Sequence, residues 1–287
     1  MTSIACPVCG SNVTRDVSTY GEFSIHRCDS CDVEFANPMK SPGKEWYENH
    51  PLYRNRYQAV GEYVGWMHKE FLVHVSGNGQ RLLDVGCGTG DFVAEACRRG
   101  FNAVGLDFDA QAIAIGRNHW KTDRLFDLSI EDYFKKQQQP FDAITFYEVL
   151  EHLESPGPFL AALKRYLKPG GRISFSIPNR DSSLNSLYRR LVPDIDYPPH
   201  HLTRWSKQSV RKALEKNGYM IEILKPLIPS LSDQTFDILR TRFNWLPHKA
   251  QRILALSISI ILLPIDLFLR RATSLEGRGM MIIAKAL

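Results

Sequence analysis

From residue 81 onwards, short apolar runs alternate with segments whose apolar residues recur at helical spacing. The apolar runs predict seven strands, at 81–86, 102–107, 124–128, 141–147, 171–177, 219–224 and 279–285. Helices are expected between them at 91–99, 109–118, 157–167 and 206–217. Repeated strand–helix units imply a doubly wound α/β fold, with a mostly parallel sheet covered by helices on both faces.

The stretch from Leu82 to Phe92, LLDVGCGTGDF, carries the most informative chemistry in the chain. Its three glycines lie between the first strand and the first helix, where backbone N–H groups can approach a ligand closely. Asp107 ends the next strand, about 20 residues past Gly86, where a carboxylate can accept both ribose hydroxyls. Together the turn and the acid indicate a nucleoside ligand.

The spacing of this turn differs from that of two better-known loops. Its third glycine comes one residue earlier than in the dinucleotide-binding turn, and no lysine follows Thr89 as a P-loop requires. A nucleoside without phosphates is therefore favoured. The run resembles motif I of the class I S-adenosylmethionine (SAM)-dependent methyltransferases. That resemblance implies a Rossmann-like methyltransferase domain with SAM as cofactor.

The same resemblance implies a set of cofactor contacts. The residues expected at the methionine end of SAM are Asp84, Gly86, Cys87, Gly88 and Gly90. Those expected around the ribose and adenine are Asp107, Phe108, Ser129 and Ile130, with backbone at Phe146 reaching the amino-acid moiety. Core packing is the alternative for the side chains of Cys87, Phe108 and Ile130.

A second cluster follows the strand at 141–147. Glu148, Glu151 and His152 lie at helical spacing, so one helical turn would present all three side chains together. Two carboxylates and an imidazole beside the cofactor make a divalent-metal site, or the histidine lies near the substrate without a metal. His200 and His201 follow a rigid Pro-Pro segment and are a second source of imidazole.

Motif I, the Glu-x-x-Glu-His run, Ser176-Ile-Pro-Asn-Arg180 and the downstream histidines together resemble two enzyme groups. These are the ubiquinone-biosynthesis O-methyltransferases and the small-RNA 3′-terminal 2′-O-methyltransferases. The resemblance covers roughly residues 80 to 224. It implies a divalent ion, Mg²⁺ or another, that holds substrate hydroxyls; without a metal, one of the histidines would act as the base. Zinc-ribbon methyltransferases that act on sugars or other bacterial cell-envelope intermediates are a comparable match.

Four cysteines near the N-terminus, Cys6, Cys9, Cys28 and Cys31, form the pattern C-x2-C…C-x2-C. This spacing predicts a closed, structural zinc site, with two disulfides or a redox dithiol as the alternatives. Disulfides fit poorly with an N-terminus that has neither a basic nor an apolar signal segment. Four thiolates would complete the zinc shell, so no catalytic role is assigned to it.

The chain has 287 residues, 44% of them hydrophobic, and a mild net charge of +5, which suit one large domain with a small appendage. We expect a zinc ribbon at 1–40 and the methyltransferase domain at 77–287. An aromatic-rich helical cap at 41–76, with helical spacing from about Tyr57, would pack over the cofactor end or form a lid. The N-terminal sequence predicts a cytoplasmic protein.

An apolar helical insertion is expected at 232–272, before the last strand. Its segment from Ile253 to Leu269 would reach about 25 Å as a helix, short of the roughly 30 Å of a bilayer core. The following strand must also rejoin the sheet, so spanning is excluded on topology. Flanking basic residues favour peripheral contact with an anionic membrane at its inner face, with a buried insertion or a dimer surface as alternatives.

The sequence therefore predicts O-methylation of a hydroxyl on a small-molecule, lipid-linked or sugar acceptor near a membrane. An RNA-modifying or RNA-binding protein that uses the ribbon as its platform is the alternative. Nucleic acid is less favoured because the chain has no dense Lys/Arg stripe and no RNA-binding aromatic motif. A non-catalytic SAM-binding scaffold is disfavoured by the complete Glu/His cluster. The acceptor and the oligomeric state stay open.

Overall fold

The computed structural model describes residues 4–43, 46, 60–61, 64–182, 196–227, 235, 239, 243, 245–272 and 277–287, with backbone alone at 248 and 265–272. Its centre is a seven-stranded sheet in the order β10-β11-β8-β7-β4-β5-β6. The strands are β4 (Arg81–Val85), β5 (Asn102–Leu106), β6 (Leu125–Phe126), β7 (Phe141–Tyr147), β8 (Leu167–Pro178), β10 (Tyr219–Leu227) and β11 (Gly279–Ala286). Strands β4 to β8 are parallel, and β11 lies antiparallel between β8 and β10. The expected doubly wound, mostly parallel sheet is confirmed.

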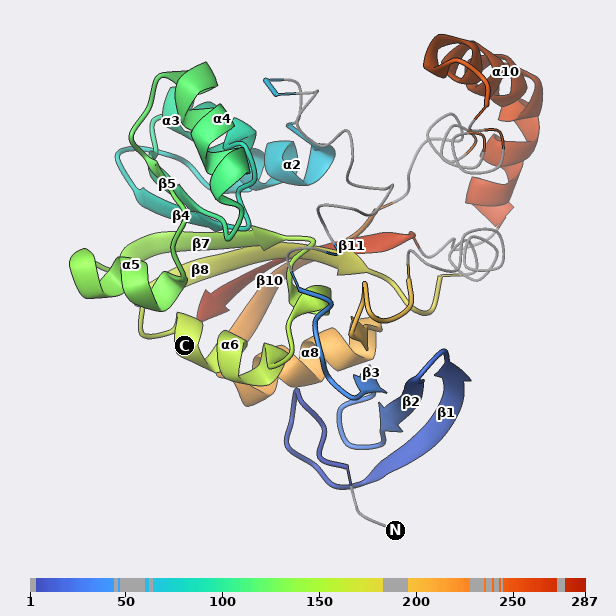
Figure 1. Ribbon diagram of the computed structural model, residues 1–287, viewed down its shortest axis with the longest axis horizontal. Helices are drawn as coiled ribbons and strands as arrows, with labels where there is room; N and C mark the ends of the chain where they lie inside the picture. Colours follow the sequence, from blue (N-terminus) through green and yellow to red (C-terminus); the bar gives the residue numbers. More distant parts are fainter. Residues whose placement is uncertain are drawn as a thin grey trace.

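Helices cover both faces of this sheet (Figure 1). One face carries α2 (Trp66–His74), α3 (Asp91–Arg98) and α4 (Ala110–Trp120), and the other carries α5 (Ile130–Lys136), α6 (Pro156–Leu163) and α8 (Lys207–Lys216). On the first face Phe71 and Phe92 pack with Leu82, and on the second Leu163 and Leu214 pack with Phe175. Because both faces are buried, the central strands read as near-continuous apolar runs.

Most predicted elements agree with the observed ones to within a few residues. The largest difference is β8, which begins at Leu167 because Leu167 pairs with Phe141 before a register shift. The short helix α5 was not expected, although Ser129 caps its first turn by accepting the N–H of Asp132 at 3.0 Å.

The N-terminal ribbon forms a second sheet with strands β1 (Thr14–Tyr20), β2 (Phe23–Cys28) and β3 (Glu34–Asn37). Its fourth strand, β9 (Thr203–Arg204), comes much later in the sequence, after β8, and pairs with β3. The buried ribbon side chains Cys6, Val8 and Phe35 join the core beneath α6 and α8. At Gly157 in α6 an added Cβ would lie 2.3 Å from the carbonyl oxygen of Val8, so only glycine permits this close approach.

Much of the expected aromatic cap at 41–76 lies outside the described residues, including the expected start of its helix near Tyr57. Two described parts of it contact the cofactor end of the sheet. The N–H of Gly61 donates to Asp91 Oδ1 at 2.7 Å, and Trp46 stacks on His200 with ring centroids 5.6 Å apart. The helix α2 packs Phe71 against Phe92.

The apolar insertion contains the helix α10 (His248–Ala272), which stands apart from the sheet at the upper right of Figure 1. Its inward side carries Gln251, Ala255 and Ser259, the first two of them buried. Among its described side chains, the exposed large apolar ones are Ile253, Leu254, Leu256, Ile260, Ile261, Leu262 and Leu263. This arrangement is the reverse of an ordinary surface helix, which turns its apolar side chains inwards. Among the described residues, no helix combines the length and apolarity needed to cross a membrane.

Candidate active site

The glycine turn joins β4 to α3 at the carboxyl end of the parallel strands, where open α/β sheets bind their ligands. Gly86, Gly88 and Gly90 have φ values of 77°, 54° and 78°, in the left-handed region that other residues rarely adopt. The N–H groups of Gly86 and Cys87 donate to the carbonyl oxygen of Leu106 at 2.8 and 3.0 Å. The turn is thus held against the end of β5, and Gly86 is exposed at the surface.

Asp107 lies directly beside this turn. Its Oδ2 accepts the N–H of Gly88 at 2.8 Å, and its Oδ1 accepts the N–H of Asp109 at 2.9 Å. Each carboxylate oxygen has a second lone pair, so the group can still accept ribose hydroxyls. The side chain of Phe108 is 64% exposed, which excludes the core-packing alternative for this residue.

Asp84, at the end of β4, is buried beneath the turn. Its Oδ1 accepts the hydroxyl of Thr145 at 2.6 Å. Burial raises the pKa of Asp84 to about 7, with a further contribution from the Asp107 carboxylate. Cys87 packs against Gly105, where an added Cβ would lie 2.7 Å from Cys87 Sγ. Burial also raises the pKa of this thiol well above its usual value, so Cys87 is a neutral packing side chain.

The residues expected around the adenine edge have structural partners of their own. Ser129 caps α5, and the side chain of Ile130 is buried in the core, as its packing alternative proposed. Phe146 is fully buried and stacks on Phe175 with ring centroids 4.8 Å apart. Contacts from these three positions to a cofactor would therefore come from the backbone, and they stay predictions.

The expectation of a single helical turn carrying Glu148, Glu151 and His152 is wrong in detail. Glu148 has a φ of 54° and precedes the short 3-10 helix η1 (Leu150–His152), so helical spacing does not relate it to the other two. Ser176, and not a helical turn, fixes the position of Glu148. The Ser176 hydroxyl donates to Glu148 Oε1 at 2.6 Å, and the Ser176 carbonyl accepts the N–H of Glu148 at 3.1 Å. A left-handed glutamate is an unusual backbone state of the kind that concentrates at functional sites.

This segment touches the cofactor turn. An added Cβ at Gly86 would lie 2.6 Å from Cγ2 of Val149, the residue between Glu148 and η1. The Glu148–His152 segment is therefore in van der Waals contact with the loop expected to hold the methionine end of SAM.

Glu151 is fully buried, and neither of its carboxyl oxygens has a hydrogen-bond partner within the part of the chain that the structure describes. Burial raises its pKa well above the usual value, and the charge of Glu148 adds to this effect. The two carboxyl groups are therefore close enough to interact, and the raised pKa of Glu151 favours its protonated form.

The structure brings His152, His200 and His201 together, with one ring nitrogen of each within 4.8 Å of the others. Glu148 and Glu151 are not members of this group of mutually close donors. His152 Nδ1 lies 2.7 Å from the carbonyl oxygen of His200, and His201 Nδ1 lies 3.3 Å from Asp196 Oδ1. A carbonyl can only accept, so Nδ1 of His152 carries the proton and its Nε2 is an acceptor. Burial and the two neighbouring histidines lower the pKa of His152 well below its ordinary value.

The four ribbon cysteines also converge. Cys6 Sγ lies 3.6 Å from Cys31 Sγ, and Cys9 Sγ lies 3.4 Å from Cys28 Sγ, with no disulfide among them. All four sulfur atoms lie within 4.8 Å of one another. Four converging thiols are the donor set of a structural zinc site, and the cluster is compatible with zinc.

Sequence reasoning missed two polar residues that support the site, Thr145 and Asp196, and it named Ser176 without expecting its bond to Glu148. Thr145 and Ser176 bond to Asp84 and Glu148, and Asp196 bonds to His201. Thr145 and Ser176 lie near the carboxyl ends of β7 and β8, which was the available signal for them. Nothing in the local pattern pairs Asp196 with His201.

Comparisons with known proteins agree with this arrangement. Residues 58–222, more than half of the chain, match the family model described as methyltransferase domain. The ubiquinone biosynthesis O-methyltransferase of Acinetobacter baumannii (strain ACICU) is 28% identical over 157 residues, which cover 52% of this chain and 64% of the relative. That of Nitrosococcus oceani is 37% identical over 111 residues, which cover 37% of this chain and 47% of the relative. The chain thus spans less than two thirds of the length of these curated relatives.

A solved structure shows the same fold. A SAM dependent methyltransferase from Archaeoglobus fulgidus superposes with a TM-score of 0.52 at 16% identity, covering 83% of this chain and 99% of that chain. The family match, the glycine turn with its acid and the strand order agree with one another. The chain therefore belongs to the methyltransferase domain family.

Proposed function

We propose that the protein transfers the methyl group of SAM to a hydroxyl group of a small-molecule, lipid-linked or sugar acceptor. The observation that carries this proposal is the cluster of His152, His200 and His201, because the Glu148–His152 segment also contacts the glycine turn. A hydroxyl is a weak nucleophile at neutral pH and needs help to lose its proton. An imidazole of this cluster would provide that help, and the lowered pKa of His152 makes it the candidate.

Methyl transfer from a sulfonium is an in-line displacement. The acceptor oxygen attacks the methyl carbon, the carbon–sulfur bond breaks, and S-adenosylhomocysteine leaves as a neutral thioether. The hydroxyl proton passes to Nε2 of His152, which the bond from Nδ1 to the carbonyl of His200 presents as an acceptor. The lowered pKa of His152 keeps the imidazole neutral before the reaction. Alignment of the acceptor with the methyl group would supply most of the remaining rate enhancement over the uncatalysed reaction.

The same residues suit a divalent ion, and we propose this as the alternative role of the cluster, because a metal bound at Nε2 of His152 would prevent that nitrogen from taking the proton. His152, His200 and His201 would hold it, with the unpartnered carboxyl of Glu151 alongside. Two of the histidines already direct Nδ1 to a carbonyl or a carboxylate, as metal-ligating histidines commonly do. Three imidazoles favour Mn²⁺, Fe²⁺ or Zn²⁺ over Mg²⁺, which prefers oxygen ligands. Such an ion would lower the pKa of the acceptor hydroxyl.

We further propose that α10 docks the enzyme on an anionic membrane surface. Its exposed apolar face supports this, because contiguous apolar patches on a protein surface mark interaction sites. Lys249 and Arg252 at its start and Arg270 and Arg271 near its end give it the charge that anionic lipid attracts.

The position of the insertion relative to the sheet links this surface to the acceptor. It connects the end of β10 to the start of β11, and Gly279 pairs there with both Leu227 and Pro178. Pro178 is the carboxyl end of β8, the edge of the sheet at which Glu148 and the glycine turn also lie. A membrane-bound enzyme would thus face the bilayer with the edge that carries the site, which favours a lipid-linked acceptor.

The test is transfer of label from methyl-labelled SAM into separate lipid, sugar-nucleotide and RNA fractions. We expect label in the lipid or sugar-nucleotide fraction, on oxygen, where it resists the alkaline hydrolysis that releases esters. Label in RNA would instead support the RNA-modifying alternative and contradict the proposal. Chelation before the reaction separates the two roles of the histidines: loss of transfer, restored by Mn²⁺, indicates a metal, and unchanged transfer indicates a base.

A further inference from the structure

The ribbon and the acceptor side of the site share one segment, residues 196–206. This segment carries His200 and His201 and continues into β9, the fourth strand of the ribbon sheet. Glu34 pairs with Arg204 and Phe35 with Thr203. The strand that follows the two histidines is therefore built on the ribbon, although the central sheet holds the cofactor turn.

The peptide groups of Leu202 connect the ribbon to Glu151. The carbonyl oxygen of Leu202 accepts the N–H of Ala36 at 2.8 Å, and its N–H donates to the carbonyl oxygen of Glu151 at 2.8 Å. The Leu202 side chain is buried against Phe23 and Ile25 of the ribbon. A continuous set of backbone hydrogen bonds thus runs from β3 through Leu202 to Glu151, the residue before His152.

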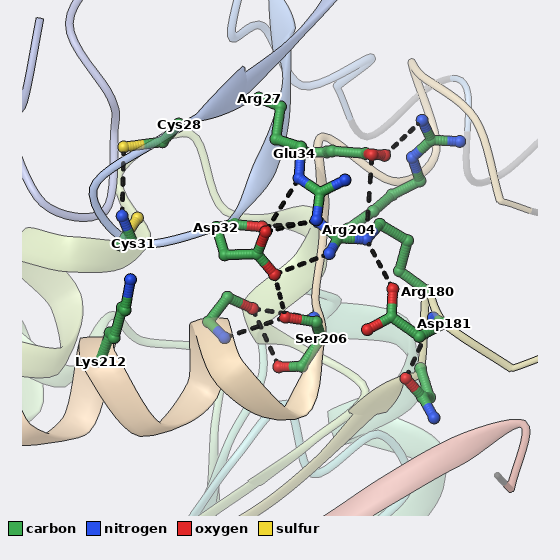
Figure 2. Close-up of polar contacts among 12 residues, drawn as sticks. Arg27, Cys28, Cys31, Asp32, Glu34, Arg180, Asp181, Arg204, Ser206 and Lys212 are labelled. Atoms are coloured by element: carbon green, nitrogen blue, oxygen red, sulfur yellow. Dashed lines mark hydrogen bonds and ion pairs between the residues drawn. The ribbon is translucent and has the colours of Figure 1, made fainter. Parts of the chain in front are cut away.

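A buried polar network centred on Asp32 fixes the other end of this segment (Figure 2). Asp32 follows the ribbon ligand Cys31 directly. Its Oδ2 accepts from Arg180 at 2.7 Å and from the Ser206 hydroxyl at 2.5 Å, while its Oδ1 accepts from Arg27 Nε at 2.8 Å. Arg180 comes from the end of β8, and Ser206 caps α8 immediately after β9. One carboxylate therefore joins three segments of the chain.

Glu34 completes the network. Its carboxylate pairs with Arg204 at 2.7 Å and lies 3.8 Å from Arg180. Asp32, Glu34, Arg180 and Arg204 are largely buried, and Arg180 also pairs with the exposed Asp181 at 3.1 Å. Removing one partner therefore leaves poorly solvated charges with fewer compensating contacts. The network consequently fixes the positions of Arg180 and Ser206, the two residues that bond to Asp32 from outside the ribbon.

The cofactor turn is held by different contacts. Its N–H groups donate to Leu106 and Asp107, which belong to β5 and the residue after it. The cofactor turn is thus positioned by the central sheet, whereas the segment that carries His200 and His201 is positioned by the ribbon.

We propose that Asp32 is a positioning residue, and that the ribbon serves the enzyme by setting the geometry of His152, His200 and His201 rather than by binding a partner. The consequence for methyl transfer rests on the proposed function. The positioning of the three histidines by the ribbon does not rest on the proposed function, because it is a property of the enzyme without its substrates.

The test compares Asp32→Asn with Asp29→Asn in the full-length chain. Asp29 lies in the same ribbon loop, but it pairs with the exposed Arg15, so it is a matched control. Ring nitrogen NMR of ¹⁵N-labelled protein, assigned with His→Gln variants, reports the tautomer and order of each histidine. We expect the Nδ1–H signals of His152 and His201 to shift or broaden in Asp32→Asn and to stay unchanged in Asp29→Asn. SAM affinity, measured by calorimetry, should stay within twofold in both variants.

Arg180→Lys provides a second variant that keeps the charge but loses the fork of the guanidinium. It should change the same signals by a smaller amount, and it decides the question if Asp32→Asn does not fold. Unchanged histidine signals in a folded Asp32→Asn or Arg180→Lys protein would overturn the proposal, as would a parallel loss of SAM affinity. Neither the histidine NMR signals nor the SAM affinity requires a methyl acceptor. A failure to find methyl transfer would therefore count against the proposed function and would not affect this inference.

Discussion

The ring Nδ1 of His152 lies 2.7 Å from the carbonyl oxygen of His200. This bond joins the segment after β7 to the segment before β9. Because the carbonyl can only accept, the bond fixes the tautomer of His152 and presents Nε2 as the acceptor. The backbone of one histidine thus sets the chemistry of another, and the cluster is expected to act as a unit.

Changing Asp107 to alanine should weaken SAM binding ten- to hundredfold. The variant loses a carboxylate that can accept two ribose hydroxyls, which is worth about 1.5–3 kcal/mol. Isothermal titration calorimetry of wild type and variant measures the change. The matched control is Asp123→Ala, an exposed acid outside the site, which should bind SAM normally. Unchanged affinity in Asp107→Ala would mean that the cofactor lies elsewhere.

The double variant Cys6→Ser/Cys9→Ser should lose the zinc that we expect in the wild type at one ion per chain. Cys6 also packs in the main core, so the variant should unfold at a lower temperature. Elemental analysis gives the metal content. Cys97→Ser, which changes a cysteine outside the cluster, should keep its zinc. A full zinc content in the double variant would refute the assignment to these thiols.

Replacing Ile253, Ile260 and Ile261 by serine should abolish binding to anionic vesicles. These side chains are 67%, 65% and 74% exposed on α10, so the change removes apolar surface without opening a cavity. Co-sedimentation with phosphatidylglycerol-containing vesicles measures binding, which salt should weaken through Lys249 and Arg252. Val73→Ser, an exposed aliphatic residue on α2, should bind like the wild type. If the wild type ignores such vesicles at low salt, α10 covers another surface.

His68 should make the protein sensitive to mild acid. Its ring is buried against Phe92 and accepts the N–H of Gly65 at Nδ1, and burial lowers its pKa to about 4. Between pH 6.5 and 4 the unfolded chain binds this proton and the folded chain does not. The free energy of unfolding therefore falls as the pH falls, by up to about 3 kcal/mol near pH 4. Urea denaturation at pH 7 and 4.5 should show a smaller difference for His68→Gln than for the wild type; equal differences would contradict this explanation.

The central sheet could be predicted because each of its strands has a recognisable local sequence pattern. Leu82, Leu83 and Val85 form an apolar run, and the glycines and Asp107 occur at fixed offsets from it. The convergence of the four cysteines followed from their spacing in the same way. These features depend on neighbours in sequence, so one chain was enough to find them.

The relationships that could not be predicted are long-range. Glu34 pairs with Arg204, and Asp32 with Arg180, across more than a hundred residues, and no periodicity connects them. The left-handed state of Glu148 was also hidden, because it depends on Ser176 of the neighbouring strand. Phe108 and Ile130 had equivalent local patterns, and only the folded chain separates the exposed ring from the core side chain.

If the proposed function is right, the cluster of His152, His200 and His201 promotes methyl transfer from SAM to a hydroxyl group. The most direct measurement is the rate of label transfer from methyl-labelled SAM to the lipid or sugar-nucleotide fraction, for wild type and His152→Ala, alongside the SAM dissociation constant of each. We predict at least a hundredfold slower transfer in His152→Ala, on the scale of a lost general base, with SAM affinity within twofold. Transfer at the wild-type rate in His152→Ala would contradict the proposed role of His152. Wild-type enzyme that transfers label into neither fraction would contradict the proposed acceptor class.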